Sequence, residues 1–160
     1  MADVRVTTTA GGEAVLKEAT VAAFNSRLRG ELLRPGHTGY EDARKVWNGM
    51  IDKRPALIVR CSGVGDVTDA IRFARENDLL VSVRCGGHNI AGKAVCDGGL
   101  MLDLSRMRNI HVDPVKRTAR VEGGATLGDL DRATQAFGLA TTAGVVTHTG
   151  VGGLTLGGGV

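Results

Sequence analysis

Aromatic side chains and net charge are both scarce in this sequence. Phe, Trp and Tyr make up 3% of the 160 residues, and the formal net charge at pH 7 is only +3. Nucleic-acid-binding proteins carry clustered basic residues, and many add rings that stack on bases. The sequence has no long basic run, so nucleic acid is not an expected partner.

Long apolar runs and paired cysteines are also missing. No stretch reaches the roughly 20 apolar residues of a membrane-spanning helix, so no membrane partner is expected. The first residues, MADVRVTTTAGG, show no signal peptide. Cys61, Cys85 and Cys96 are odd in number and have no framework spacing, which predicts free thiols in a cytoplasmic protein.

Glycine, by contrast, is abundant. The 24 glycines are roughly twice the average share. They gather beside segments with the character of strands, which indicates backbone in close contact with something, not a flexible linker. These clusters are Gly86–Gly87, Gly98–Gly99, Gly123–Gly124 and Gly150–Gly159.

The amino-terminal part is predicted to be helical. Apolar residues at helical spacing predict a helix over 12–29, which Pro35 and Gly36 end. A second, shorter helix is predicted over 41–48, with Trp47 on its apolar side.

Strands and helices alternate from residue 56 onward. Residues 56–60 and 79–84 are apolar enough for buried strands, and 66–77 has helical spacing with Asp66 as the N-cap. A strand–helix–strand unit of this kind predicts parallel pairing through a crossover helix.

Further strands are predicted over 100–104, 109–112 and 118–121. Asp113-Pro114 is a strong turn signal, so the last two should form a hairpin.

A helix over 126–137 is predicted next, with Thr126 and Asp129 as a capping box and Gly138 at its C-terminal end. Residues 139–142 are expected to be short and extended.

The glycines from residue 144 onward are too dense for a stable helix interior. A sequence that stops inside such a run is predicted to be part of a longer protein.

The segment 84–92, RCGGHNIAG, is the first candidate site, because it follows a strand directly. Two adjacent glycines let a ligand approach the main chain, and successive N–H groups can form a nest for an anion such as a pyrophosphate. The segment matches neither the Rossmann fingerprint nor the P-loop. A plain turn is the alternative. A metal site of Cys85, His88 and Cys96 lacks the fourth ligand that zinc prefers.

The second candidate site is the glycine-rich stretch 144–159. Thr147, His148, Thr149 and Thr155 offer hydroxyl and imidazole groups for hydrogen bonds. A surface loop is the alternative explanation for this stretch.

Four elements in order, RCGGHNIAG, CDGGLMLDLSRM, VEGGATLGDL and GLATTAGVVTHTGVGGLTLGGG, carry a family resemblance. Over about residues 40–160 the sequence resembles the FAD-binding domain of the vanillyl-alcohol oxidase and p-cresol methylhydroxylase (PCMH) superfamily. The match is best to berberine-bridge-enzyme-like oxidases and the bacterial 6-hydroxy-D-nicotine oxidase type.

The resemblance implies an α+β class, the PCMH-type FAD-binding fold with two α/β subdomains, here ending before its last strands. It also implies a division into an N-terminal helical segment, 1–50, and an FAD-binding domain, 51–160, incomplete at its C-terminus.

In that family a histidine in the first loop is bonded to the 8α-methyl carbon of the flavin, and here the matching residue is His88. Val146 stands where some relatives have a cysteine that forms a second link, so a single link is expected. His148 could face the cofactor, although a surface or core position is the simpler expectation. The expected FAD-binding residues are Arg84, Cys85, Gly86, Gly87, His88, Asn89, Ala91, Gly92, Gly144, Thr149, Gly150, Gly153 and Gly157. Arg84 could offset phosphate charge or be structural.

The resemblance further implies the FAD-binding part of an FAD-dependent oxidoreductase, an oxidase or dehydrogenase. Its partners would be a small organic substrate and an electron acceptor, dioxygen or another. Catalytic acid–base residues in these relatives come mostly from later sequence, so none is assigned here, and these residues alone are expected to lack turnover. The alternative is a non-catalytic module that binds a flavin or another phosphate ligand.

Overall fold

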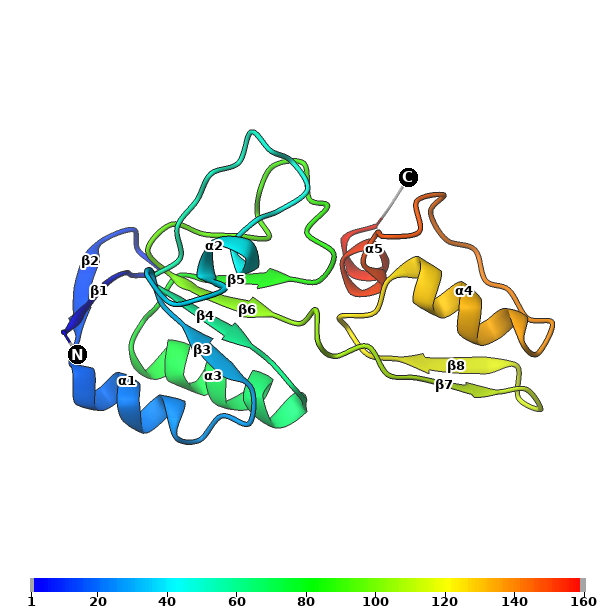
Figure 1. Ribbon diagram of the computed structural model, residues 1–160, viewed down its shortest axis with the longest axis horizontal. Coiled ribbons are helices and arrows are strands. Elements are labelled where there is room, and N and C mark those ends of the chain that lie inside the picture. The colour runs from blue at the N-terminus through cyan, green and yellow to red at the C-terminus, as the bar shows by residue number, and fades with distance from the viewer. Residues whose placement is uncertain (1, 159–160) are drawn as a thin grey trace.

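The computed structural model describes residues 2–158. At its centre is a four-stranded sheet in the order β3-β4-β6-β5 (Figure 1). Strands β4, β6 and β5 are parallel, whereas β3 pairs with β4 in the antiparallel direction. The bounds are Glu31–Leu33 for β3, Leu57–Arg60 for β4, Val81–Arg84 for β5 and Leu100–Asp103 for β6.

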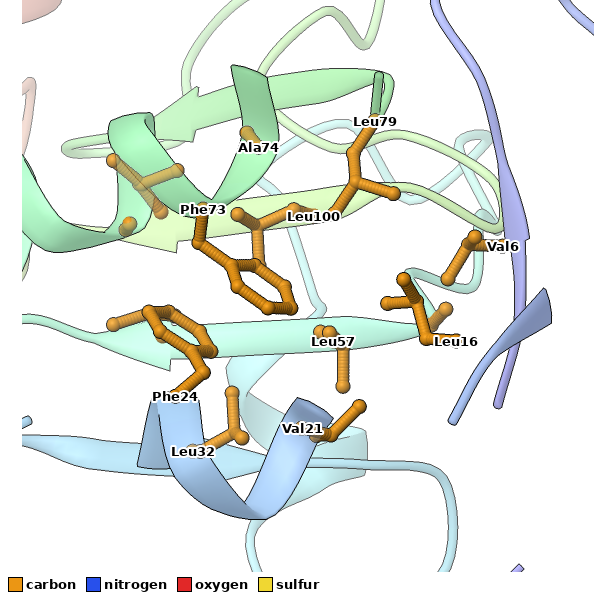
Figure 2. Close-up of a cluster of buried hydrophobic side chains, with 14 of the residues drawn as sticks. Val6, Leu16, Val21, Phe24, Leu32, Leu57, Phe73, Ala74, Leu79 and Leu100 are labelled. Carbon is orange, nitrogen blue, oxygen red and sulfur yellow. The ribbon is translucent and has the colours of Figure 1, made fainter. Parts of the chain in front are cut away.

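Two helices cover one face of this sheet, α1 (Glu18–Asn25) and α3 (Val64–Glu76) (Figure 1). The rings of Phe24 and Phe73 stack between them with centroids 4.0 Å apart. Figure 2 shows these rings against apolar side chains of the sheet. Full burial of one such side chain is worth roughly 1.5–3 kcal/mol. This cluster therefore holds the sheet and its helices together.

The short helix α2 (Tyr40–Ala43) lies on the opposite face. Tyr40 is fully buried and packs with Ile58 of the sheet, and its hydroxyl donates to the Pro55 carbonyl at 2.7 Å. The predicted helix over 41–48 is thus correct only in its first residues, and residues 44–48 are not helical.

The amino-terminal residues form a hairpin that was not predicted. Strand β1 (Val4–Thr7) pairs antiparallel with β2 (Glu13–Leu16). The prediction of a helix over 12–29 is therefore wrong at its start, because pairing with β1 satisfies this backbone and buries Leu16. Residues 1–50 also include β3, so the description of this segment as helical is corrected, while a boundary near residue 50 stays a prediction.

The strand–helix–strand unit is present, but its two strands are not neighbours. Strand β6 lies between β4 and β5 and bonds to both in parallel. The expected parallel direction is confirmed, and the pairing partner is β6.

Helix α3 begins two residues before the predicted N-cap, with Gly63 as the cap. Asp66 lies in its first turn and is buried. Its carboxylate accepts hydrogen bonds from the N–H groups of Arg29, Gly30 and Ser62. Asp66 therefore links the segment between α1 and β3 to the start of α3. An N-cap side chain bonds only to N–H groups of its own helix, so this role differs from the predicted one.

A second, smaller unit follows the sheet (Figure 1). It consists of the predicted hairpin and the helices α4 and α5. Thr126 and Asp129 form the predicted capping box of α4, which is confirmed. The bounds are Ile110–Asp113 for β7, Thr118–Val121 for β8, Leu127–Gln135 for α4 and Val151–Gly157 for α5.

Helix α5 contradicts the expectation of a glycine-rich loop after residue 144. The N–H of Val151 donates to the Ala125 carbonyl, and Leu154 bonds back to Gly150. These tertiary and helical bonds outweigh the low helix propensity of glycine. Residues 139–142 form no strand, and Gly159 lies outside the described residues.

Asp129 gives a pH-dependent test of the second unit. Burial opposes its charge, but hydrogen bonds from Thr126 and Arg108 outweigh burial and lower its pKa from 3.8 to about 2. A lowered folded-state pKa stabilises above the unfolded value and is lost as pH falls through the folded one. Asp129→Asn should therefore cost about 2 kcal/mol at pH 7.

In unfolding experiments this difference should shrink between about pH 4 and pH 2. Asp131→Asn, at an exposed position of the same helix, is the matched control and should change stability little. Equal losses for Asp129→Asn at pH 7 and pH 2 would contradict the assignment.

Candidate functional site

The candidate site lies where the sheet unit meets the second unit. The loop after β5 and the start of α5 border a cavity of about 580 Å³. Among the expected site residues, the following line it: Cys85, Gly86, Gly87, His88, Asn89, Thr149, Gly150, Gly153 and Gly157.

Four expected residues do not line this cavity. Arg84 lies beneath the loop, Ala91 is exposed, and Gly144 is exposed on the other side of α5, close to Leu127 and Leu154. Gly92 has a positive φ of 69° and is buried against Ile51.

The two glycine-rich segments touch each other directly. A Cβ atom added to Gly86 or to Gly150 would overlap the backbone of the other residue. Thr126 and Gly150 also form an antiparallel bridge. Gly86 and Gly150 are therefore required at least for contact between the two units, a role that the sequence alone did not separate from ligand contact.

The loop after β5 presents free backbone donors. Within residues 2–158, none of the N–H groups of Gly86, Gly87 and His88 donates to a backbone carbonyl. Gly87 has a φ of 72°, which glycine adopts readily and which turns the chain here. Lys93 adds a cationic side chain to the cavity lining. This donor set fits the pyrophosphate of a dinucleotide.

Arg84 supports the loop from below. Asp103, with 1% of its surface exposed, lies between Arg60 and Arg84, and the nearest nitrogens are 3.5 and 3.3 Å from its Oδ2. These three residues end β4, β6 and β5 at matching register. The Arg84 Nη1 also donates to the Ala43 carbonyl at 3.2 Å. The geometry thus places Arg84 in a structural ion cluster.

His88 is half-buried and belongs to a group of three rings. Its ring centroid is 5.1 Å from that of Trp47 and 4.8 Å from that of His148. Burial is the largest cause of the lowered pKa of His88, and the charge of nearby His148 lowers this pKa further. The neutral imidazole, which is the nucleophilic form, is therefore favoured near neutral pH.

Two contributions to the site could not be predicted from the sequence. Trp47 was assigned only to a helix face, because nothing local links it to a loop forty residues later. Lys93 and the apolar lining side chains Val83, Leu104, Leu154 and Leu156 carry no motif. Val146, at the position of the second link in some relatives, is exposed.

The residues from 2 to 158 contain no group of three or more His, Cys, Asp or Glu side chains that could hold a metal ion. Cys96 is instead buried beside Ser82. In the described part of the chain no helix has the length and apolar character needed to cross a bilayer.

A mixed sheet with three parallel strands, followed by a glycine loop that borders a cavity with unpaired amides, fits a domain that binds a phosphate-containing cofactor. The chain belongs to the FAD binding domain family, whose sequence profile matches residues 55–160. The α+β class and the PCMH-type fold expected from the sequence are confirmed by this match and by the solved structures below.

Among the relatives is the (R)-6-hydroxynicotine oxidase of Paenarthrobacter nicotinovorans, 43% identical over 133 residues, which are 83% of this chain and 29% of the relative. An FAD-linked oxidoreductase of Dictyostelium discoideum is 44% identical over 88% of this chain and 31% of its own length. The chain thus spans about three-tenths of the length of these relatives.

Solved structures agree with this assignment. The 6-hydroxy-D-nicotine oxidase of Arthrobacter nicotinovorans superposes with a TM-score of 0.77 at 42% identity, over 79% of this chain and 28% of that one. The berberine-bridge-enzyme-like protein 1 of Physcomitrella patens gives a TM-score of 0.79 at 26% identity, over 87% and 31%.

Proposed function

We propose that this chain is the FAD-binding part of an FAD-dependent oxidoreductase, and that His88 holds the flavin through a single covalent bond. The observation that carries the proposal is the position of His88. Its imidazole borders the cavity beside the free amides of the loop, and its surroundings favour the neutral form. A domain that only gripped phosphate would have no need of this imidazole.

Different residues of the site would hold different parts of the cofactor. The amides of Gly86, Gly87 and His88, with Lys93, would hold the pyrophosphate, and the apolar side chains of the cavity would exclude water. Bound FAD would supply the two-electron oxidation of a small organic substrate. The relatives' names, 6-hydroxynicotine oxidase and aclacinomycin oxidase among them, support a small organic substrate here.

The covalent bond would join a ring nitrogen of His88 to the 8α-methyl carbon, with dioxygen as the oxidant. His88 would release its N–H proton, one methyl hydrogen would leave, and the two electrons would reduce dioxygen to hydrogen peroxide. Dioxygen or another acceptor would serve in turnover as well.

The free cysteines among the described residues fit our proposal of a cytoplasmic protein.

The test uses the full-length protein. After denaturation and electrophoresis, the wild-type band should show flavin fluorescence, and His88→Ala should abolish it while some FAD remains bound without a covalent bond. His111→Ala, at an exposed histidine outside the site, is the matched control and should keep the fluorescence.

Two other outcomes would contradict parts of the proposal. A dark wild-type band with free FAD in the supernatant would reject the His88 bond and leave FAD binding intact. A colourless protein that does not take up added FAD would favour a non-catalytic module for another phosphate ligand.

A further inference from the structure

Trp47 belongs to no sequence motif, yet the fold holds it directly at the site. The N–H of Trp47 donates to the Gly87 carbonyl at 3.0 Å. Asn48 Nδ2 donates to the Ile90 carbonyl, also at 3.0 Å. The segment after α2 is thus fastened along the loop that carries His88 by backbone and amide bonds that do not involve the indole.

The indole itself packs on the histidines. Its plane is within 17° of the His88 plane, with the centroids 5.1 Å apart, so the two rings are stacked. The His148 ring is tilted by 43° and 42° against the other two, at 4.5 and 4.8 Å. Because Trp47 remains 65% exposed, its ring contributes little to the core and covers the imidazoles.

We propose that Trp47 is a positioning residue for covalent flavin attachment: its indole holds the His88 imidazole against rotation and aims it into the cavity. The inference rests on the proposed bond at His88. Stacking of two rings restricts the side-chain rotamers of His88 and covers one face of the imidazole. An attacking group that is already oriented reacts faster than one that must find its orientation first.

The contact between the Trp47 indole and His88 also shields the imidazole from solvent. Burial is the first cause of the lowered pKa of His88, and the indole supplies part of that burial. The other ionisable side chains at this part of the site are His148, in ring contact with His88, and Lys93, which lines the same cavity. Both side chains remain when Trp47 is replaced, so a change in the pH dependence of His88 would report the loss of the indole.

The experiment measures attachment directly and does not depend on turnover. Full-length apo-protein from riboflavin-limited cells is mixed with FAD, and acid precipitation at intervals separates flavin in the pellet from free FAD. Trp47→Ala should bind FAD but attach it between about twofold and tenfold more slowly than wild type at pH 7. Trp47→Phe retains a ring and should stay within about twofold of wild type.

A second readout is the pH profile of apo-protein histidine signals in NMR. In Trp47→Ala the pKa of His88 should rise towards 6.5, whereas Trp47→Phe should leave it near the wild-type value. A purely structural role for Trp47 would lower thermal stability and leave this profile unchanged.

The outcomes separate the two proposals. If Trp47→Ala attaches FAD at the wild-type rate and the pKa of His88 is unchanged, the positioning role of Trp47 is overturned. The covalent bond at His88 would still stand. Wild-type protein that binds FAD without attaching it would overturn the bond, and the positioning role with it.

Discussion

Gly150→Ala should disturb the contact between the two units and lower the free energy of unfolding by about 1–3 kcal/mol. The backbone at Gly150 has φ −74° and ψ 127°, which alanine adopts without strain. The cost is therefore one of space. The added methyl group would overlap the Cys85 Sγ and the N–H of Gly86, and the backbone of Gly86 has no free rotation with which to move aside.

Thermal unfolding of the full-length protein would measure this effect. Gly153→Ala, in the same helix, is the matched control because its new methyl group meets nothing within 4 Å. Alanine there should be neutral or stabilise α5 by up to about 1 kcal/mol. Equal melting temperatures for the two variants would show that the contact between Gly86 and Gly150 does not hold the units together.

Asp103→Ala should destabilise the sheet unit by about 3–5 kcal/mol, since it leaves Arg60 and Arg84 as neighbouring positive charges without their shared carboxylate. The effect should reach the site, because Arg84 is the last residue before the glycine loop. We therefore expect weaker FAD binding as well as a lower free energy of unfolding, both measured by titration at pH 7.

Asp103→Asn separates charge from shape. Its side-chain oxygen can still accept from the Ser105 N–H, as Oδ1 of Asp103 does at 3.0 Å, while the charge is gone. A large loss for both variants would assign the effect to charge. Asp52→Ala, at an exposed partner of Arg44, is the control and should cost no more than about 1 kcal/mol. A similarly small cost for Asp103→Ala would contradict the role of the ion cluster.

Local signals in the sequence predicted the local elements well. The hairpin around Asp113-Pro114 and the capping box of Thr126 and Asp129 depend on residues a few positions apart, and both are present. The strands at 57–60, 81–84 and 100–103 follow from apolar runs. The family resemblance added the assignment of both glycine-rich segments to one cofactor site, which no spacing rule predicts.

Long-range contacts account for what the sequence did not predict. The strand at 13–16 depends on its partner at 4–7, and α5 depends on bonds to Ala125. The position of β6 between β4 and β5 is a property of the sheet and not of any segment. A backbone hydrogen bond to Gly87 places Trp47 at the site. Neither local sequence predicts this bond.

The placement of β6 in the middle of the sheet has a consequence for biosynthesis. On the ribosome, β4, α3 and β5 emerge before residues 100–103, but β4 and β5 have no bonds to each other and must wait for the strand between them. The apolar edges of both strands stay open for that time, when a nascent chain is vulnerable to aggregation. We expect the loop with His88 to become ordered only after β6 is inserted, so flavin should be captured late, after translation has passed this strand.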